Sequence, residues 1–404
     1  MNFITEKSKQ IPVADRFDVA VCGGGIAGIS AALSAARENK KVILIENQFM
    51  PGGLATAGLV TIFLPLCDGE GHQVSYGICE ELIRLSVKYG YEDEPIPNVW
   101  CGEHTAEERA KAKRYRCQYN PQVFAILCEQ LLLSFGVKIL YGSRVCDVLR
   151  DSDRISDIVV ENKGGRIAYS VGAVVDTTGD ADICKLAQVP TVEFGQGNSL
   201  AAWHYTLKNG KYNLHMCGFS DVPDESGKYA QSSENTLSNK RYYGLDGDDL
   251  SGMSIAAHKT ILEQFLKGGQ ANENRALATI ATIPQIRMTR KIVGEYELAH
   301  TEMHTYFEDS IGMVSNWKKR GPVYEVPFRT LYNRDMKNLI VAGRCTSVNE
   351  TLWDVMRVIP CCAVTGQAAG IAATMTDDFS TLDVALLQQK LRENGVVIHE
   401  KDLQ

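Results

Sequence analysis

Hydrophobic and polar positions at the start of the chain alternate in blocks that predict a strand, a helix and a second strand. Residues 17–22 are mostly apolar, which is typical of a strand buried within a parallel sheet. Residues 29–38 are rich in Ala, Leu and Ser and favour a helix, whereas residues 42–45 are aliphatic and favour a strand. A strand, a helix and a parallel strand in this order form the unit of doubly wound α/β folds.

The same reading predicts one long helix and several short strands further along the chain. The helix is expected at residues 119–135, where apolar side chains recur at helical spacing. Strands are expected at residues 136–141, 144–149, 158–161 and 166–169, and adjacent glycines join the last two as a hairpin. Near the C-terminus, a strand is expected at residues 339–342 and a helix rich in Gly and Ala at residues 360–375.

The middle of the chain has a different character. Between about residues 188 and 327 the regular alternation of strand and helix is lost, and polar loops such as 210–247 intervene. We therefore expect an α/β fold with two domains. Residues 1–187 and 328–404 form a doubly wound, Rossmann-like domain, and residues 188–327 form an inserted α+β domain.

A glycine-rich turn joins the first predicted strand to the first helix. Gly23, Gly25 and Gly28 satisfy the spacing G-x-G-x-x-G, and Glu46 ends the second strand. The first glycine permits the tight turn, the second lets a pyrophosphate approach the backbone, and the third allows close helix–strand packing. The N–H groups of the helix N-terminus favour phosphate, and Glu46 is placed to accept hydrogen bonds from a ribose. The pattern predicts a dinucleotide site; a structural turn without a ligand is the alternative.

A second glycine-rich loop, residues 50–58, follows the acid. With it the chain resembles the FAD-dependent oxidoreductases of the glutathione-reductase-like FAD-binding class, in which GGGxAG opens the chain and GGxATxG follows the acid. Three further segments match that family in order: residues 173–182, residues 285–294 with the pattern RxTRxIxG, and residues 338–370 with the closing AGR and GQAAG patterns. The resemblance covers roughly residues 17–375. It implies FAD and says nothing of the substrate.

The resemblance also implies which residues bind FAD. They are Gly23, Gly25, Ile26, Ala27, Gly28, Glu46, Asn47, Gly53, Leu54, Ala55, Thr56, Val145, Thr178, Gly179, Asp182, Gly343, Arg344, Val358, Ile359, Pro360 and Cys361. A helix that begins near Pro360 would stabilise the negative charge that collects near N1 of a reduced flavin. The loop from Gly52 to Gly58 has no His, Cys or Tyr, so FAD is expected to be non-covalent. Cys67 and Cys345 are the remaining candidates for a covalent link.

Candidate catalytic residues are fewer. Arg287 and Arg290 match the arginines of the family's RxTR pattern and are candidates to bind an anionic substrate, because guanidinium pairs with carboxylate through two hydrogen bonds. A salt bridge between domains is the alternative for both. Arg357 precedes the closing helix and is a candidate to reach flavin or substrate. His204 is a candidate base by residue type alone, and an ordinary packing histidine is the alternative.

Composition and charge narrow the function further. The 404 residues include 42 Lys and Arg against 49 Asp and Glu, a net charge of -7 that disfavours nucleic-acid binding. No cysteine pair has C-x-x-C spacing, so a zinc ribbon or iron–sulfur cluster has no support and no metal is expected. The adjacent Cys361 and Cys362 are expected to be buried thiols rather than a redox pair. The N-terminus lacks a signal-peptide pattern and no run spans a bilayer, so we expect a cytoplasmic protein.

These observations predict an FAD-dependent oxidoreductase. It would transfer a hydride between a small polar or anionic organic substrate and non-covalent FAD. Two alternatives remain open: a flavoprotein subunit that passes electrons to a protein partner, and a non-redox FAD-binding protein. No second G-x-G-x-x-G occurs, so a separate NAD(P)H domain is not expected. The sequence leaves the oligomeric state undefined.

Overall fold

The computed structural model describes residues 4–89, 105, 107–108, 116–218 and 237–403. Its centre is a seven-stranded sheet in the order β5-β2-β1-β8-β7-β6, with β16 also paired to β8. The strands are β1 (Val13–Cys22), β2 (Val42–Ile45), β5 (Lys138–Leu140), β6 (Arg144–Asp151), β7 (Arg154–Asn162), β8 (Gly165–Asp176) and β16 (Leu339–Val341). Strands β5, β2, β1, β8 and β16 are parallel, whereas β6 and β7 pair antiparallel. The sequence prediction of an α/β, Rossmann-like fold is confirmed.

Strand β8 forms hydrogen-bonded pairs with three other strands. One edge pairs with β1 along almost its whole length. On the other edge, the first half of β8 pairs with β7, and Val174–Asp176 pair with β16. Because β16 lies near the C-terminal end of the sequence, the sheet is completed only by a segment distant from β1 and β2.

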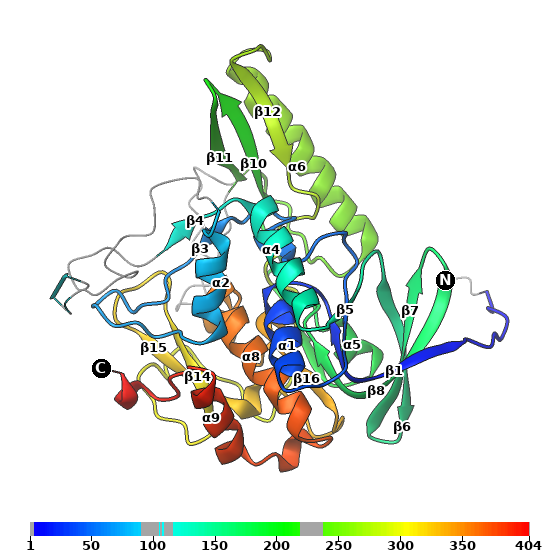
Figure 1. Cartoon of the computed structure of the whole chain (residues 1–404). Coiled ribbons are helices and arrows are strands. Elements are labelled where there is room, and N and C mark those ends of the chain that lie inside the picture. Colours follow the sequence, from blue (N-terminus) through cyan, green and yellow to red (C-terminus); the bar gives the residue numbers. More distant parts are fainter. Residues whose placement is uncertain (1–3, 90–104, 106, 109–115, 219–236, 404) are drawn as a thin grey trace.

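Two cores flank the sheet. Val19 and Val21 of β1 contact the core beneath α1 (Ile26–Arg37), α2 (Ile78–Ser86), α4 (Pro121–Ser134) and α8 (Ile359–Met375). Figure 1 shows these four helices together on one side of the sheet. Ala20 and Cys22 alternate to the other face, where they join a core with α5 (Asp182–Leu186) and residues of β6 and β7. Burial on both faces explains why Val19–Cys22 of β1 and the whole of β2 are apolar without interruption.

Helices α1 and α8 pack closely because their contact is made by small residues. A Cβ built on Gly366 would lie 2.3 Å from the Ala27 carbonyl oxygen, and a Cβ on Gly370 would lie 2.3 Å from the Ala31 carbonyl oxygen. Both pairs advance by four residues in the same direction, so the two helices run parallel. Their N-termini therefore lie at the same edge of the sheet.

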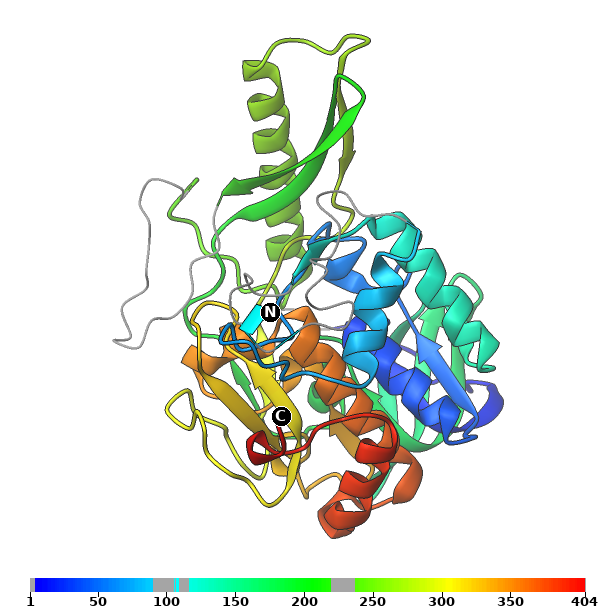
Figure 2. The same ribbon diagram turned by 60° about the vertical axis from the view of Figure 1, so that its left-hand side comes forward.

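An arm extends from this body, as Figures 1 and 2 show. It consists of the antiparallel sheet β11-β10-β12 and the long helix α6 (Gly247–Lys267). The strands are β10 (Ala201–Lys208), β11 (Lys211–Gly218) and β12 (Arg275–Ile280). A separate small core, which includes Met253, Ala257 and Ile261, joins α6 to this sheet.

The remaining strands form pairs around the body. They are β3 (Ile62–Phe63) with β4 (Cys117–Gln118), β9 (Thr191–Glu193) with β13 (Arg290–Ile292), and β14 (Ser310–Ser315) with β15 (Val323–Pro327). Ile311 and Val314 of β14 belong to the core beneath α8. The last helices are α7 (Glu350–Met356) and α9 (Val384–Glu393). The domain boundaries at residues 187/188 and 327/328 stay predictions.

The structure corrects two expectations from the sequence. Helix α1 begins at Ile26 instead of residue 29, because Gly25 is its N-cap and Gly28 lies in its first turn. The polar loop expected from residue 210 is wrong in its first part, because β11 pairs with the whole of β10 as a hairpin. Asn209 and Gly210, with φ of 51° and 75°, form its turn. Asn-Gly is the usual sequence signal for such a turn.

Membrane-spanning elements were also sought in the described part of the chain. No single helix there combines the length and the apolar composition that a span requires. Only α7 and α8 taken together pass that test, and this pair is bent by 87° and mostly buried in protein.

Candidate cofactor cleft

The carboxyl ends of the parallel strands meet at a cleft of about 500 Å³. Cys22 ends β1, Glu46 follows β2, Thr177 follows β8 and Ala342 follows β16, and all four residues line the cleft. Residues 244–247 line it as well. Open α/β sheets bind ligands at this edge, where the strand order reverses.

The N-termini of α1 and α8 both reach this cleft, where Ile26 and Ile359 line it. The N-cap residues of the two helices, Gly25 and Val358, make no side-chain hydrogen bond to the first turn. First-turn N–H groups lack partners inside a helix and carry its positive dipole end. Two helices therefore present N–H groups and positive potential to the same cleft, an arrangement that favours an anionic ligand such as a pyrophosphate.

The three glycines of the first turn have different tasks. Gly23 has φ of 107°, and a Cβ there would lie 2.5 Å from the Thr177 carbonyl oxygen. A Cβ on Gly28 would lie 1.9 Å from the Gly23 carbonyl oxygen. Both positions are therefore required by the protein's own packing. A Cβ on Gly25, in contrast, would meet nothing within 4 Å, so this glycine leaves open space in the cleft wall. A ligand can approach the backbone there.

Glu46 is held in a fixed orientation beside this turn. One carboxylate oxygen accepts a hydrogen bond from Gly24 N–H (2.7 Å) and the other from Gln48 N–H (2.6 Å). Burial raises the pKa of Glu46, and these backbone hydrogen bonds oppose that shift. Each carboxylate oxygen can accept more than one hydrogen bond. Glu46 can therefore keep both backbone contacts and also accept hydrogen bonds from ribose hydroxyls.

The second glycine-rich loop is joined to the first. Gly52 donates a hydrogen bond to the Gly24 carbonyl oxygen (2.7 Å), and Gly52 has φ of 107°. A Cβ on Gly53 would lie 3.3 Å from the Cα of Gly25. The side chain of Thr56 donates to the Pro51 carbonyl oxygen (2.6 Å) and so stabilises the loop. The two loops form one continuous wall of the cleft.

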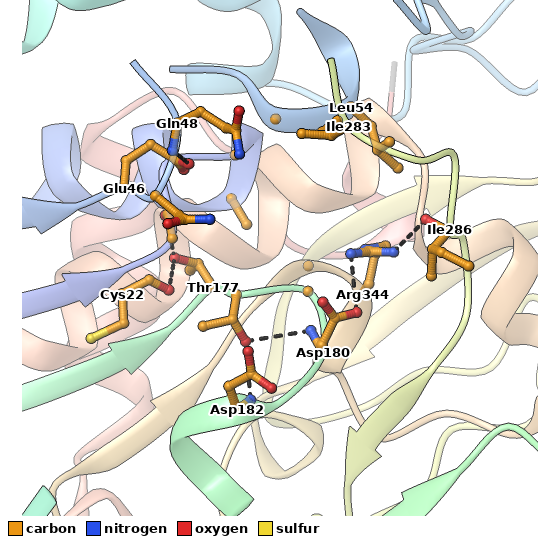
Figure 3. Close-up of a pocket in the computed structure, with 18 of the residues that line it drawn as sticks. Cys22, Glu46, Gln48, Leu54, Thr177, Asp180, Asp182, Ile283, Ile286 and Arg344 are labelled. Carbon is orange, nitrogen blue, oxygen red and sulfur yellow. Dashed lines mark hydrogen bonds and ion pairs between the residues drawn. The ribbon is translucent and has the colours of Figure 1, made fainter. Parts of the chain in front are cut away.

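A cluster of charged residues forms another wall, shown in Figure 3. Arg344 donates to the Ile286 carbonyl oxygen (2.6 Å) and lies 3.3 Å from an Asp180 carboxylate oxygen. Asp180 also accepts a hydrogen bond from the Thr289 hydroxyl (2.6 Å). Gly179 has φ of 83°, which favours glycine, and a Cβ there would lie 2.3 Å from the Arg344 guanidinium and displace it. Arg344 thus fixes the turn after β8 against the segment that contains Ile286.

Comparison with known proteins identifies the family of this chain and its cofactor. The family described as FAD dependent oxidoreductase matches residues 18–200 and 197–391, which together are most of the chain. The chain belongs to the FAD dependent oxidoreductase family. This oxidoreductase is also similar to a thioredoxin reductase of Ureaplasma parvum serovar 3, with 33% identity over 252 residues, which are 62% of this chain and 68% of that protein. The protein is therefore an FAD-dependent enzyme.

Solved structures with a related arrangement include a geranylgeranyl bacteriochlorophyll reductase-like protein from Thermoplasma acidophilum. Its TM-score is 0.45 at 14% identity, over 94% of this chain and 83% of that chain. A triple mutant of a flavin-dependent brominase has a TM-score of 0.49 at 11% identity, over 94% of this chain and 84% of that chain.

Most residues that the sequence assigns to FAD line the cleft of the oxidoreductase. They are Gly23, Gly25, Ile26, Ala27, Glu46, Asn47, Gly53, Leu54, Ala55, Val145, Thr178, Gly179, Asp182, Gly343, Arg344 and Ile359. These residues lie on both glycine-rich loops, at the N-termini of α1 and α8, on β6, and on the turns after β2, β8 and β16. They are the residues that would hold FAD in this cleft.

Five other assigned residues, Gly28, Thr56, Val358, Pro360 and Cys361, are not among the residues that line the cleft. Gly28 and Thr56 support the two loops through the contacts described above. Val358 and Pro360 begin α8, and the Cys361 thiol donates to the Val355 carbonyl oxygen (3.2 Å). The next residue, Cys362, lines the cleft instead.

The candidate arginines of the oxidoreductase lie in different surroundings. Arg290 pairs with Asp182 (2.7 Å), and neither Arg290 nor Arg287 lines the cleft. Arg287 is buried and donates to the Gln285 carbonyl oxygen (3.4 Å). Arg357 does line the cleft, where it pairs with the buried Asp354.

Two carboxylates beside these arginines have shifted pKa values. Burial raises the pKa of Asp182 to about 6, with contributions from Asp180 and Asp176, although Arg290 opposes them. Burial also acts to raise the pKa of Asp354, but its two cations, Arg357 and Lys318, outweigh it and hold that pKa below the usual value. Asp354 is therefore an anion that compensates the charge of Arg357.

His204 lies away from the cleft on β10, with 3% of its surface exposed. Its ring stacks on His215 with centroids 5.2 Å apart. Burial, with a smaller contribution from His215, lowers the pKa of His204 to about 4. These contacts are typical of a packing histidine.

Cys67 and Cys345, the candidates for a covalent link to FAD, are fully buried and do not line the cleft. The Cys345 thiol accepts a hydrogen bond from Ala181 N–H (3.2 Å). In the described part of the chain, no group of three or more His, Cys, Asp or Glu is placed to hold a metal ion.

The sequence did not predict that residues at the base of the arm line one wall of the cleft. Residues 244–247 and Leu250, together with Ile283, Pro284 and Ile286, complete the cleft. Asp246 is the N-cap of α6 and accepts a hydrogen bond from Asp249 N–H (2.8 Å). An acidic N-cap before a helix is a recognisable signal. Its position beside the cofactor edge depends on tertiary packing and has no local signal.

Proposed function

We propose that this oxidoreductase transfers a hydride between a small polar or anionic organic substrate and non-covalent FAD, and that it belongs to the glutathione-reductase-like FAD-binding class. The order of the two glycine loops, Glu46 and the closing segment supports this class. The bound FAD supplies N5 as the hydride acceptor or donor. The substrate would lose a hydride and a proton in the oxidative direction.

The state of the cysteines supports non-covalent FAD. Cys22 and Cys362 are the cysteines among the described residues that line the cleft. Burial raises the pKa of Cys22 well above its usual value and that of Cys362 to about 11. Because the thiolate is the nucleophile, both thiols are poorly reactive near neutral pH.

The observation that supports a polar substrate is the buried side chain of Gln285. It is 2% exposed and does not itself line the cleft, but its sequence neighbours Pro284 and Ile286 do. Its side-chain oxygen is buried and has no hydrogen-bond partner. An unsatisfied buried acceptor is costly, so a substrate that donates a hydrogen bond there would gain affinity. An anionic substrate would instead contact Arg357, which lines the cleft beside its carboxylate partner Asp354.

Two variants separate these substrate types. Gln285→Met removes the acceptor at similar volume and should lower the apparent substrate affinity up to about tenfold, as expected for one neutral hydrogen bond. Arg357→Met should lower the affinity roughly thirtyfold or more if a buried substrate carboxylate loses its cation. FAD content serves as the control in both. Unchanged substrate affinity in both variants would contradict the proposed contacts.

Similarity to a thioredoxin reductase favours one second candidate, a flavoprotein that passes electrons to a protein partner. Two observations argue against electron transfer through a pair of thiols within this chain. The sequence has no C-x-x-C motif, and the Cys362 thiol donates a hydrogen bond to the Arg357 carbonyl oxygen (3.4 Å).

Anaerobic addition of candidate metabolites, followed by the flavin absorbance, tests the proposed function. Bleaching by a small polar metabolite supports the hydride-transfer proposal, and rapid reoxidation by a small acceptor supports it further. Reoxidation only by a protein fraction would favour electron transfer to a partner. FAD that dithionite reduces but no metabolite bleaches would favour the non-redox alternative.

A further inference from the structure

Two segments that join the arm to the body also line the cofactor cleft. Residues 244–247 lead into α6, whereas Ile283, Pro284 and Ile286 follow β12. Both segments therefore lie at the base of the arm, which Figure 2 shows above the body. The placement of this wall of the cleft depends on the contacts that hold the base of the arm.

The two segments are in contact with each other. A Cβ on Gly244 would lie 2.9 Å from the Ile286 side chain, so Ile286 packs directly on the backbone of Gly244. Arg344, which lines the cleft, donates to the carbonyl oxygens of Ile286 (2.6 Å) and Arg287 (3.2 Å). Figure 3 shows Arg344 beside Ile286. The two segments thus form one unit, whose orientation is set by the side chains that anchor it.

Asn198, three residues before β10, anchors both segments. Its Nδ2 donates to the carbonyl oxygens of Tyr242 (3.1 Å) and Met288 (2.7 Å). Its Oδ1 accepts from the N–H groups of Arg287 (3.1 Å) and Met288 (3.2 Å). Asn198 is 5% exposed, and an amide has two donor hydrogens and two acceptor positions. All four are used here, so the side chain has one fixed orientation.

Asp249 fixes the same wall from the first turn of α6. Its Oδ2 accepts hydrogen bonds from the N–H groups of Tyr243 (2.5 Å) and Gly244 (2.8 Å). Gly244 has φ of 74°, so the chain turns sharply at this point. Two consecutive N–H groups that share one carboxylate oxygen hold this turn in a defined orientation relative to α6.

We propose that Asn198 and Asp249 are positioning residues for FAD, which hold the base of the arm so that it closes one side of the cofactor cleft. Neither residue lines the cleft. Each is bonded instead to the segments that do, because Gly244 lines the cleft and Arg287 follows Ile286 directly. This inference goes beyond hydride transfer and does not depend on the identity of the substrate.

Asn338 provides a matched control, because it is a second buried asparagine whose side chain bonds the backbone. It is 2% exposed, donates to the carbonyl oxygens of Ile155 and Gly172 (2.9 Å each), and accepts from Ile155 N–H (2.8 Å). Asn338 precedes β16, whose other end reaches the cleft at Ala342. Asn198→Leu and Asn338→Leu should both lower the urea midpoint, since each leaves buried backbone groups unpaired.

Calorimetric titration of the FAD-free full-length protein separates the two variants. Asn198→Leu should raise the dissociation constant for FAD about tenfold or more, the lower end of what loss of orienting partners costs in metal sites. At saturating FAD, the circular dichroism of the flavin in the visible region should also be weaker, because the cofactor is held less rigidly. Asn338→Leu should keep the wild-type values of both.

Asp249→Ala is the second test, because Asp249 is only partly buried and its loss should leave the protein folded. It should raise the dissociation constant for FAD roughly threefold or more. Its control is Asp383→Ala, which removes the N-cap of α9 and its hydrogen bond from Leu386 N–H (3.1 Å) and should not affect FAD.

Three results would overturn the proposal. One is a wild-type dissociation constant and flavin circular dichroism in folded Asn198→Leu and Asp249→Ala. Another is an equal loss of FAD affinity in Asn338→Leu, because the effect would then follow from stability alone. If Asn198→Leu does not fold, wild-type FAD binding in Asp249→Ala is sufficient to overturn it, whereas weaker binding than in Asp383→Ala supports it.

Discussion

Replacement of Gly25 by valine separates the requirements of FAD binding from those of folding. Gly25 has φ of -67°, which any residue adopts, and a Cβ there meets no heavy atom within 4 Å. The free energy of unfolding of the FAD-free protein should therefore change by less than about 1 kcal/mol. The new side chain would, however, fill the space beside the first turn of α1, where a pyrophosphate needs to approach the backbone.

The size of the effect follows from the hydrogen bonds that are lost. If valine holds the pyrophosphate away from two N–H groups, each charge-assisted hydrogen bond lost costs about 1.5–3 kcal/mol. A total of about 3–6 kcal/mol raises the dissociation constant for FAD roughly 100- to 20,000-fold. Calorimetric titration of the FAD-free protein with FAD measures this constant, and FAD released on denaturation gives the content of the purified variant.

Gly28→Ala is the contrasting variant. Its Cβ would lie 1.9 Å from the Gly23 carbonyl oxygen, so the protein should lose stability even without FAD. Wild-type FAD affinity in Gly25→Val would refute the assignment of this space to the cofactor. A Gly25→Val protein that is unfolded before FAD is added would refute the claim that only the ligand needs the glycine.

Three further predictions concern packing, protonation and reactivity. Gly370→Val should destabilise the protein by about 1–3 kcal/mol in urea titrations, because its Cβ would lie 2.3 Å from the Ala31 carbonyl oxygen; unchanged stability would contradict the close contact of α1 with α8. Burial raises the pKa of Asp182 from 3.8 to about 6, so the folded state binds this proton more tightly. Stability should therefore fall as the pH rises from about 4 to 6, and Asp182→Asn should lack this component when urea midpoints are compared across that range. The Cys362 thiol, with its pKa raised to about 11, should react slowly with iodoacetamide at pH 7 in the FAD-free protein, and rapid labelling detected by mass spectrometry would argue against it.

Local patterns were sufficient to predict the cofactor edge of the sheet. The strand before Gly23, the helix after Gly25 and the acid Glu46 are each determined by neighbours in sequence, and the structure brings all of them to one cleft. Gly25 and Gly28 match the same motif. Only the structure separates the glycine that leaves room for a ligand from the one that the fold itself requires.

The partners of charged residues could not be predicted in the same way. Arg290 pairs with Asp182, which lies 108 residues earlier, and Arg344 bonds a carbonyl group of a distant segment. Such contacts depend on how the segment that follows the arm, residues 283–290, packs against the sheet. Helix α6 was not predicted from the sequence. Its exposed face also carries apolar residues, such as Ile255, so apolar side chains do not recur only at the 3.6-residue spacing of an amphipathic helix.

The shared edge of β8 has a consequence for biosynthesis. The C-terminal end of that edge, Val174–Asp176, is completed by β16, which begins only at Leu339. During translation, β1, β2 and both glycine-rich loops emerge from the ribosome long before this strand. The nascent chain must therefore wait with an open sheet edge beside the future cofactor site, and such edges are prone to aggregation. A complete FAD site consequently requires that the chain has been synthesised through β16.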